Sequence, residues 1–198
     1  MMPEQYLTDN DRKFLLKLAR ESIENYVNNR PLPNFDKKAL SQVLQEDGAS
    51  FVTLTFKGYL RGCVGALDPY QCLTEDVREH AIAAAFEDYR FPPVRAAEVG
   101  DIKIEISYLT RPEVIKYNNP IDLLEILRPN IDGVVIRDGM RRATFLPQVW
   151  EKIPDPAEFL NHLCQKMGAR SNLWCDTKLQ VYVYQVEEFH EMNNNSTA

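Results

Sequence analysis

Long apolar runs are missing from this sequence. No stretch reaches the roughly 18–20 apolar residues that a helix needs to cross a bilayer. The polar opening MMPEQYLTDNDRKF also lacks the apolar segment of a secretory signal peptide. We therefore expect a cytoplasmic protein without a membrane segment. The net charge of −6 argues in addition against broad electrostatic binding to nucleic acid.

Familiar catalytic and ligand-binding motifs are missing as well. The sequence contains no GxGxxG or GxxxxGK[ST] phosphate loop and no GxSxG, HExxH or DxDxDG run. No two cysteines have CxxC spacing, and the three histidines are scattered. We therefore predict no metal site and four free thiols, at Cys63, Cys72, Cys164 and Cys175. Nothing in the sequence identifies a cofactor.

What is present indicates one globular domain over residues 1–190, followed by a disordered tail over residues 191–198. The 198 residues are 44% hydrophobic, which is enough for a core. Apolar periodicity predicts helices over residues 8–27, 74–87 and 155–168. Thr74 is the expected cap of the second helix, and its small residues at 81–85 indicate tight packing on the sheet. Strands are expected over residues 50–56, 60–66, 101–109, which has one polar face, and 179–186, and a hairpin over residues 134–146 with Asp138-Gly139 at its turn. Because helices and hairpins mix without regular β-α-β alternation, we expect an α+β fold with an antiparallel sheet and flanking helices.

The densest chemistry lies in YLRGCVGAL, residues 59–67. If this run is an extended strand, Tyr59, Arg61, Cys63 and Gly65 share one face. A guanidinium two residues from a thiol favours the thiolate, the reactive form of cysteine. Gly62 and Gly65 flank the cysteine, and glycine in a strand marks a bulge or a close approach. The alternative is a buried core cysteine on a bent strand.

A second unusual run is DYRFPPV, residues 88–94. Pro92 and Pro93 fix an extended backbone, which predicts a rigid loop that presents Tyr89, Arg90 and Phe91. In the alternative interpretation, Phe91 fills the core and Arg90 caps the preceding helix.

Few other side chains suggest chemistry. The candidates for binding an anionic group are Arg90, Arg142 and Thr144, and the candidates for stacking on a planar ligand are Tyr59, Tyr89 and Phe91. A catalytic cysteine usually works with a base, often histidine. His80 and His162 both lie on predicted helices, where surface or core roles are favoured.

Four blocks of this sequence resemble the AMMECR domain family. LRGCVG, residues 60–65, is similar to the family's LRGCIG signature. The other blocks follow in the family's order: AIAAAFEDYRFPPV at 81–94, RRATFLPQVW at 141–150 and DPAEFLNHLCQKMGA at 155–169. The resemblance runs from the first helix to about residue 189. The departures, Val64 and Met167, lie outside the candidate site.

The resemblance implies an α+β fold with a larger and a smaller subdomain and a cleft between them. It also implies partners, because bacterial and archaeal proteins of this family occur alongside a Memo-like protein and a radical-SAM protein. The residues that match the family's motifs are Arg61, Gly62, Cys63, Gly65, Arg90, Phe91, Pro92, Pro93, Thr144 and Pro147. The resemblance identifies no reaction.

Two functions therefore remain open at this stage. In the first, the protein is an enzyme in which Cys63, activated by Arg61, acts as a nucleophile or redox thiol. Arg90 and Arg142 then hold an anionic small molecule. In the second, the protein is a non-catalytic binding or adaptor module for a Memo-like or radical-SAM partner. The lack of an identifiable base, metal site or phosphate loop favours this second function.

Overall fold

The structure, a computed structural model, describes residues 7–191 and divides the chain into two compact units. Unit 1 combines the chain up to Thr110 with the segment that starts at Glu187, and unit 2 runs from Arg111 to Val186. Each unit packs helices against an antiparallel sheet, which confirms the expected α+β class. In the described part of the chain, no helix combines the length and the apolar character needed to cross a membrane.

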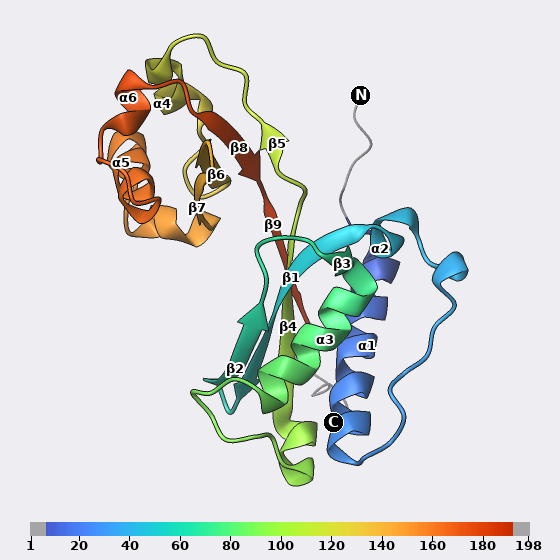
Figure 1. Cartoon of the computed structure of the whole chain (residues 1–198). Helices are drawn as coiled ribbons and strands as arrows, with labels where there is room; N and C mark the ends of the chain where they lie inside the picture. Colours follow the sequence, from blue (N-terminus) through green and yellow to red (C-terminus); the bar gives the residue numbers. More distant parts are fainter. Residues whose placement is uncertain (1–6, 192–198) are drawn as a thin grey trace, which may run out of the picture. The chain divides into compact units, whose positions relative to one another are not determined.

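Unit 1 holds a five-stranded sheet with the path β2-β1-β4-β9, in which β3 pairs with β1. Its strands are β1 (Asp47–Phe56), β2 (Tyr59–Gly65), β3 (Gln71–Cys72), β4 (Ile102–Leu109) and β9 (Val186–His190). Its helices are α1 (Asp9–Val27), η1 (Lys37–Ala39), α2 (Gln42–Gln45), α3 (Leu73–Phe86) and η2 (Ala96–Asp101). Helices α1 and α3 cover one face of this sheet (Figure 1). We call the opposite face, which carries Thr53, Thr55, Lys103 and Glu105, the outer face.

The long helices of unit 1 form where the sequence predicts them. Thr8 caps α1, because its Oγ1 accepts the N–H of Asp11 and the Asp11 carboxylate accepts the N–H of Thr8. Helix α3 presents alanines to the sheet and approaches β2 at backbone distance. A Cβ atom at Gly62 would lie 2.0 Å from the carbonyl oxygen of Ala84. Position 62 therefore requires glycine for this close packing.

A β-bulge interrupts the pairing of β2 with β1 at Arg61. The β1 residues 55 and 54 pair with Leu60 and Gly62, so Arg61 is an extra residue in β2. After the bulge, Cys63 lies directly opposite Thr53. Thr53 and Cys63 therefore share the outer face, and Gly62 faces α3.

The bulge corrects one expectation, and the start of α3 corrects another. Tyr59 pairs with Phe56, which packs on the core side, so the prediction that Tyr59 and Cys63 share a face is wrong. The extra residue shifts the alternation by one position. The N-cap of α3 is Cys72 and not Thr74, because the Thr74 hydroxyl donates instead to the carbonyl of Leu44, 2.7 Å away.

Unit 2 holds a four-stranded sheet with the path β5-β8-β6-β7. Its elements are β5 (Glu113–Val114), η3 (Pro120–Asp122), α4 (Leu123–Ile126), β6 (Gly133–Asp138), β7 (Arg141–Phe145), η4 (Pro147–Glu151), α5 (Pro156–Lys166), α6 (Leu173–Asp176) and β8 (Gln180–Tyr184). Its core centres on Trp150 and Phe159, whose rings stack 3.6 Å apart. The predicted hairpin forms with Gly139 at positive φ in its turn.

The end of the chain differs from the expectation. The sequence predicts one strand over residues 179–186, but β8 and β9 are separate strands that belong to different sheets. Glu191, expected in the tail, is bound in unit 1. Its Oε2 lies 2.5 Å from Nη2 of Arg20, and its N–H donates to the carbonyl of Ile104. The rest of the predicted tail, residues 192–198, lies outside the described residues.

Candidate functional site

Cys63 lies half-buried on the outer face, near the middle of the edge strand β2. The hydroxyl of Thr53 donates a hydrogen bond to its Sγ over 3.3 Å. A hydroxyl donor stabilises a sulfur atom that carries negative charge. Gly65 follows Cys63 on the same face. A Cβ atom at position 65 would lie 2.4 Å from ring atoms of Phe51, so the close packing there requires glycine. The thiol is therefore an edge group with a polar partner and is not enclosed in the apolar core.

An aspartate and an arginine fix the backbone of Cys63. The N–H of Cys63 donates to Oδ2 of Asp88 over 2.9 Å, and Nη2 of Arg90 donates to the carbonyl of Cys63 over 3.1 Å. Arg90 and Asp88 are also ion-paired, with 2.6 Å between Nη2 and Oδ2. We call this pair the Asp88–Arg90 clamp. It satisfies both backbone polar groups of Cys63 at a sheet edge, where they would otherwise be open to another strand.

The clamp also holds fixed charges beside the thiol. The hydrogen bonds from Arg90 keep the pKa of the Asp88 carboxyl well below its usual range, with a further contribution from the N–H of Cys63. The same ion pair raises the pKa of Arg90. The Arg90 side chain is 44% exposed, and its Nη1 takes part in none of the clamp's hydrogen bonds. Arg90 therefore presents one edge of a permanent cation next to Cys63.

Arg61 directs its charge elsewhere. Its guanidinium is mostly buried and pairs with Glu98 of η2, with 3.3 Å between Nε and Oε1. The pKa of Glu98 is lowered by the N–H of Arg95 and by Arg61. The positive charge of Arg61 is thus balanced by a neighbouring carboxylate. Of the two arginines near Cys63, Arg90 has the more open guanidinium.

The loop that follows α3 matches neither alternative completely. Phe91 is half-buried, and the Arg90 guanidinium lies 5.6 Å from the centre of its ring. Arg90 binds the edge of β2 and not the end of the helix. Pro92 and Pro93 are exposed, and Tyr89 is 96% exposed. The loop therefore holds the edge of β2 through Arg90 and exposes the aromatic side chain of Tyr89 to solvent.

The remaining predicted anion-binding residues belong to unit 2. Thr144 is buried, and its Oγ1 lies 3.2 Å from the hydroxyl of Tyr184. Arg142 is half-buried on β7, opposite Arg137 of β6. The structure thus gathers Cys63, Arg90 and Phe91 in unit 1, with Arg61 on the same strand, and places Arg142 and Thr144 in unit 2.

A buried polar network, absent from the sequence-based prediction, explains His80. Ser50 donates to Oδ2 of Asp76 over 2.6 Å, and Nδ1 of His80 lies 3.2 Å from the same oxygen. These groups lie between α3 and the helix-covered face of the sheet, whereas Cys63 lies on the outer face. His80 is therefore not positioned as a base for Cys63. Residues four apart on a helix are neighbours on its surface, so the spacing of Asp76 and His80 in the sequence could have predicted that they pair.

Asp88 was also missed, although it precedes Arg90 by two residues just after a predicted helix. No motif marks it, and only the pairing with the Cys63 backbone reveals its role. Within residues 7–191, no group of three or more His, Cys, Asp or Glu side chains is arranged to hold a metal ion.

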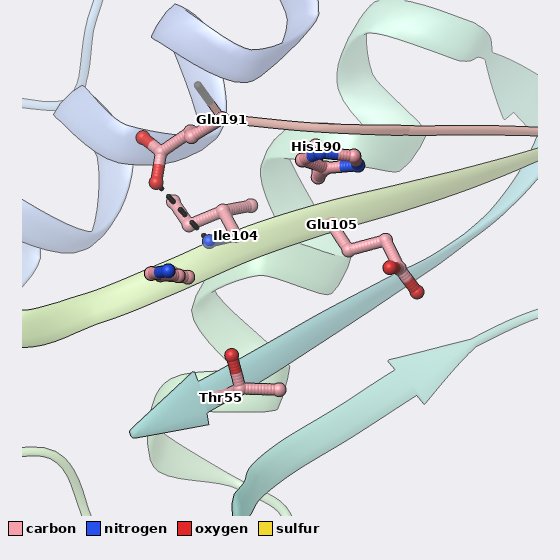
Figure 2. Close-up of a pocket in the computed structure, with 6 residues that line it drawn as sticks. Thr55, Ile104, Glu105, His190 and Glu191 are labelled. Carbon is pink, nitrogen blue, oxygen red and sulfur yellow. Dashed lines mark hydrogen bonds between the residues drawn. The ribbon is translucent and has the colours of Figure 1, made fainter. Parts of the chain in front are cut away.

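A pocket of about 310 Å³ opens on the outer face of unit 1. It is lined by Thr55, Lys103, Ile104, Glu105, His190 and Glu191. Figure 2 shows Thr55, Glu105 and His190 around this pocket, on the three neighbouring strands β1, β4 and β9. The sequence predicted the polar face of β4, but His190 is more than 80 residues away in the chain and only the sheet topology places it there.

Comparison with known proteins agrees with the architecture. The family model AMMECR1 matches residues 16–189. A protein of Methanothermobacter thermautotrophicus is 37% identical over 193 residues, which span 93% of this chain and 96% of that protein. Protein MK0488 of Methanopyrus kandleri is 37% identical over 195 residues, covering 93% of this chain and 90% of the relative.

A solved structure is similar over the same extent. The crystal structure of uncharacterized protein PH0010 from Pyrococcus horikoshii superposes with a TM-score of 0.71 and 33% sequence identity, and it covers 93% of each chain. The sequence blocks, the fold and these relatives agree, and the chain belongs to the AMMECR1 family.

Proposed function

We propose that this protein is an enzyme in which Cys63 acts as a nucleophile or redox thiol on an anionic small molecule. The observation that carries the proposal is the environment of Cys63. Its sulfur accepts the Thr53 hydroxyl on the outer face, and the Asp88–Arg90 clamp fixes its backbone. A partly exposed thiol beside a cation and a hydroxyl donor has the features of a reactive cysteine.

The roles of the arginines follow from their partners. Arg90 would attract the anionic group of the substrate, because its guanidinium is partly open to solvent next to the thiol. Arg61 would act through position and not through direct contact, since its ion pair with Glu98 holds the bulged segment of β2 in place.

The test is a comparison of Cys63→Ser with Cys175→Ser, a change at an exposed cysteine of unit 2. Both variants should fold, because neither removes a side chain from an apolar core. Screening for turnover of anionic metabolites should give activity in the wild type and Cys175→Ser, and none in Cys63→Ser. Full activity of Cys63→Ser on any substrate found in this way would refute the thiol mechanism.

A second function is favoured by a separate observation. Large side chains are exposed near the same edge of unit 1: Tyr59 is 79% exposed, Leu60 45% and Tyr89 96%. Exposed aromatic side chains are typical of protein-binding surfaces. In this alternative, the edge docks a Memo-like or radical-SAM partner. A pull-down with Tyr59→Ser and Tyr89→Ser should then lose the partner, and retention by both variants would exclude this edge as the docking surface.

A further inference from the structure

The thiol site described so far has a nucleophile but no group that transfers a proton. His80 of α3 lies on the helix-covered face of the sheet and not on the outer face. The strand register points to a different group. Thr53 of β1 is paired with Cys63 of β2 on one side and with Glu105 of β4 on the other. Because paired residues of neighbouring strands point to the same face, these three side chains form one row on the outer face.

The spacing of this row leaves room for a small molecule between the thiol and the carboxylate. Neighbouring strands are about 4.8 Å apart, so the backbones at Cys63 and Glu105 lie about 10 Å apart across the sheet. Thr53 lies between them, and its short side chain donates to the sulfur of Cys63. A reacting group must come within about 3 Å of both the nucleophile and the residue that transfers its proton. A carbonyl group above Thr53 can meet both requirements.

Two further side chains of β1 border the space above Thr53. Phe51 and Thr55 lie two residues before and after Thr53, so they point to the same face. The ring of Phe51 lies over Gly65 of β2 and gives this end of the space an apolar wall. At the other end, Thr55 and Glu105 line the pocket of about 310 Å³. The space is therefore apolar at one end and continuous with a polar pocket at the other.

The carboxylate of Glu105 is not committed to a structural contact. It is half-buried, and within residues 7–191 it makes no hydrogen bond or ion pair. Glu191, the other carboxylate of the pocket, is instead held by Arg20 and by the N–H of Ile104. Figure 2 shows the Glu105 side chain at the pocket. A polar pocket of this size has room for water beside the carboxylate.

We propose that Glu105 is a catalytic residue, and that Cys63 and Glu105 together hydrolyse a small ester or thioester that carries an anionic group. The proposal rests on the proposed function and specifies its reaction and substrate class. In the first step, the thiolate of Cys63 attacks the carbonyl carbon and a C–S bond forms. The alcohol or thiol part of the substrate leaves as an anion. Arg90, at the edge of β2 beside the thiol, holds the anionic group of the substrate.

Glu105 acts in the second step, as a general base. Its carboxylate takes a proton from a water molecule in the pocket while the water oxygen attacks the carbon of the thioester. The C–S bond breaks, Cys63 becomes a thiolate again, and the acyl group leaves as a carboxylic acid. The proton on Glu105 then passes to the anion released in the first step or to solvent. The reaction therefore consumes one water molecule and needs no other co-reactant.

The test uses mono-p-nitrophenyl succinate, an ester with a free carboxylate whose leaving group needs no proton. The wild type should hydrolyse it repeatedly. In Glu105→Gln, the first step should persist, but hydrolysis of the thioester should slow about 100-fold or more. This variant should therefore release about one equivalent of nitrophenolate per chain and then stop, with the succinyl group found on Cys63 by mass spectrometry. The neutral p-nitrophenyl acetate should acylate Cys63 more slowly, and equal rates would overturn the anionic substrate.

Glu24→Gln is the matched control, because it makes the same change of charge at an exposed position of α1, on the other side of the sheet. It should hydrolyse the ester as the wild type does. Repeated hydrolysis by Glu105→Gln at the wild-type rate would overturn the proposal, and so would loss of the acylation step itself in that variant.

The proposed function is separated from this proposal by iodoacetamide. If wild-type Cys63 is alkylated in the native protein but is never acylated by the ester, the hydrolysis is overturned and the reactive thiol stands. If native Cys63 is neither alkylated nor acylated, the proposed function fails together with the role of Glu105.

Discussion

Replacement of Gly62 by alanine should separate β2 from α3. The new Cβ would lie 2.0 Å from the carbonyl oxygen of Ala84 and 3.0 Å from its carbonyl carbon, well inside ordinary contact distance. Both atoms belong to the backbone, so no flexible side chain can move away. Adding a methyl group to a packed interior typically costs about 1–3 kcal/mol. Because the backbone of Ala84 is rigid, we expect Gly62→Ala to lower the free energy of unfolding by about 2–3 kcal/mol, near the upper end of this range.

The assay is urea unfolding followed by circular dichroism at neutral pH. Gly100→Ala is the control, because no heavy atom lies within 4 Å of its added Cβ. That change should be neutral or stabilise the protein by up to about 1 kcal/mol through the unfolded chain. Alkylation of Cys63, the next residue, should also change in Gly62→Ala because β2 must move. If Gly62→Ala and Gly100→Ala have equal stability, the close packing of α3 on β2 is refuted.

Two further predictions concern the surroundings of the thiol. Asp88→Asn should destabilise the protein at pH 7, because the carboxylate that pairs with Arg90 is lost. Because folding lowers the pKa of Asp88, its carboxylate contributes to the free energy of unfolding at pH values above the pKa of about 3.9 in the unfolded chain. This contribution is lost progressively as the pH falls below that value. The difference in unfolding free energy between wild type and Asp88→Asn, measured in urea, should therefore shrink at low pH. A difference that does not change with pH would contradict this. Thr53→Val should slow alkylation of Cys63 at neutral pH about tenfold, as expected for the loss of one hydrogen bond to a charged group, whereas Thr53→Ser should retain the wild-type rate.

Much of the fold was predictable because the local signals agree with the tertiary structure. The capping box at Thr8, the turn at Gly139 and the Asp155-Pro156 start of α5 each fix an element end through nearby residues. The small residues of α3 correctly predicted close packing on the sheet. These features depend on contacts within a few residues or on a single helix face.

The features that could not be predicted from the sequence depend on pairing between strands that are far apart in the chain. The bulge at Arg61 is set by the register against β1, and it decides which side chains accompany Cys63 on the outer face. The alternating residues 179–186 give no sign of the break between β8 and β9, because the two different sheets that these strands join determine where β8 ends.

The candidate site shows the same limit. Its motif residues Cys63 and Arg90 were predicted from the sequence, and the structure brings them together. Asp88, Thr53 and Glu105 were not predicted as site residues, because their importance comes from hydrogen bonds and strand pairing across the fold. The type of a residue does not by itself reveal which distant residues it will contact in the fold.

The central claim is that Cys63 is a reactive thiol, and the most direct measurement is alkylation of the native protein by iodoacetamide at neutral pH. Mass spectrometry assigns the modification to each cysteine over time. We predict that Cys63 reacts first, ahead of the exposed Cys175, and that Cys164 stays protected because it is fully buried and burial raises its pKa. If Cys63 reacts only when the protein unfolds, it is a structural residue and the account is wrong.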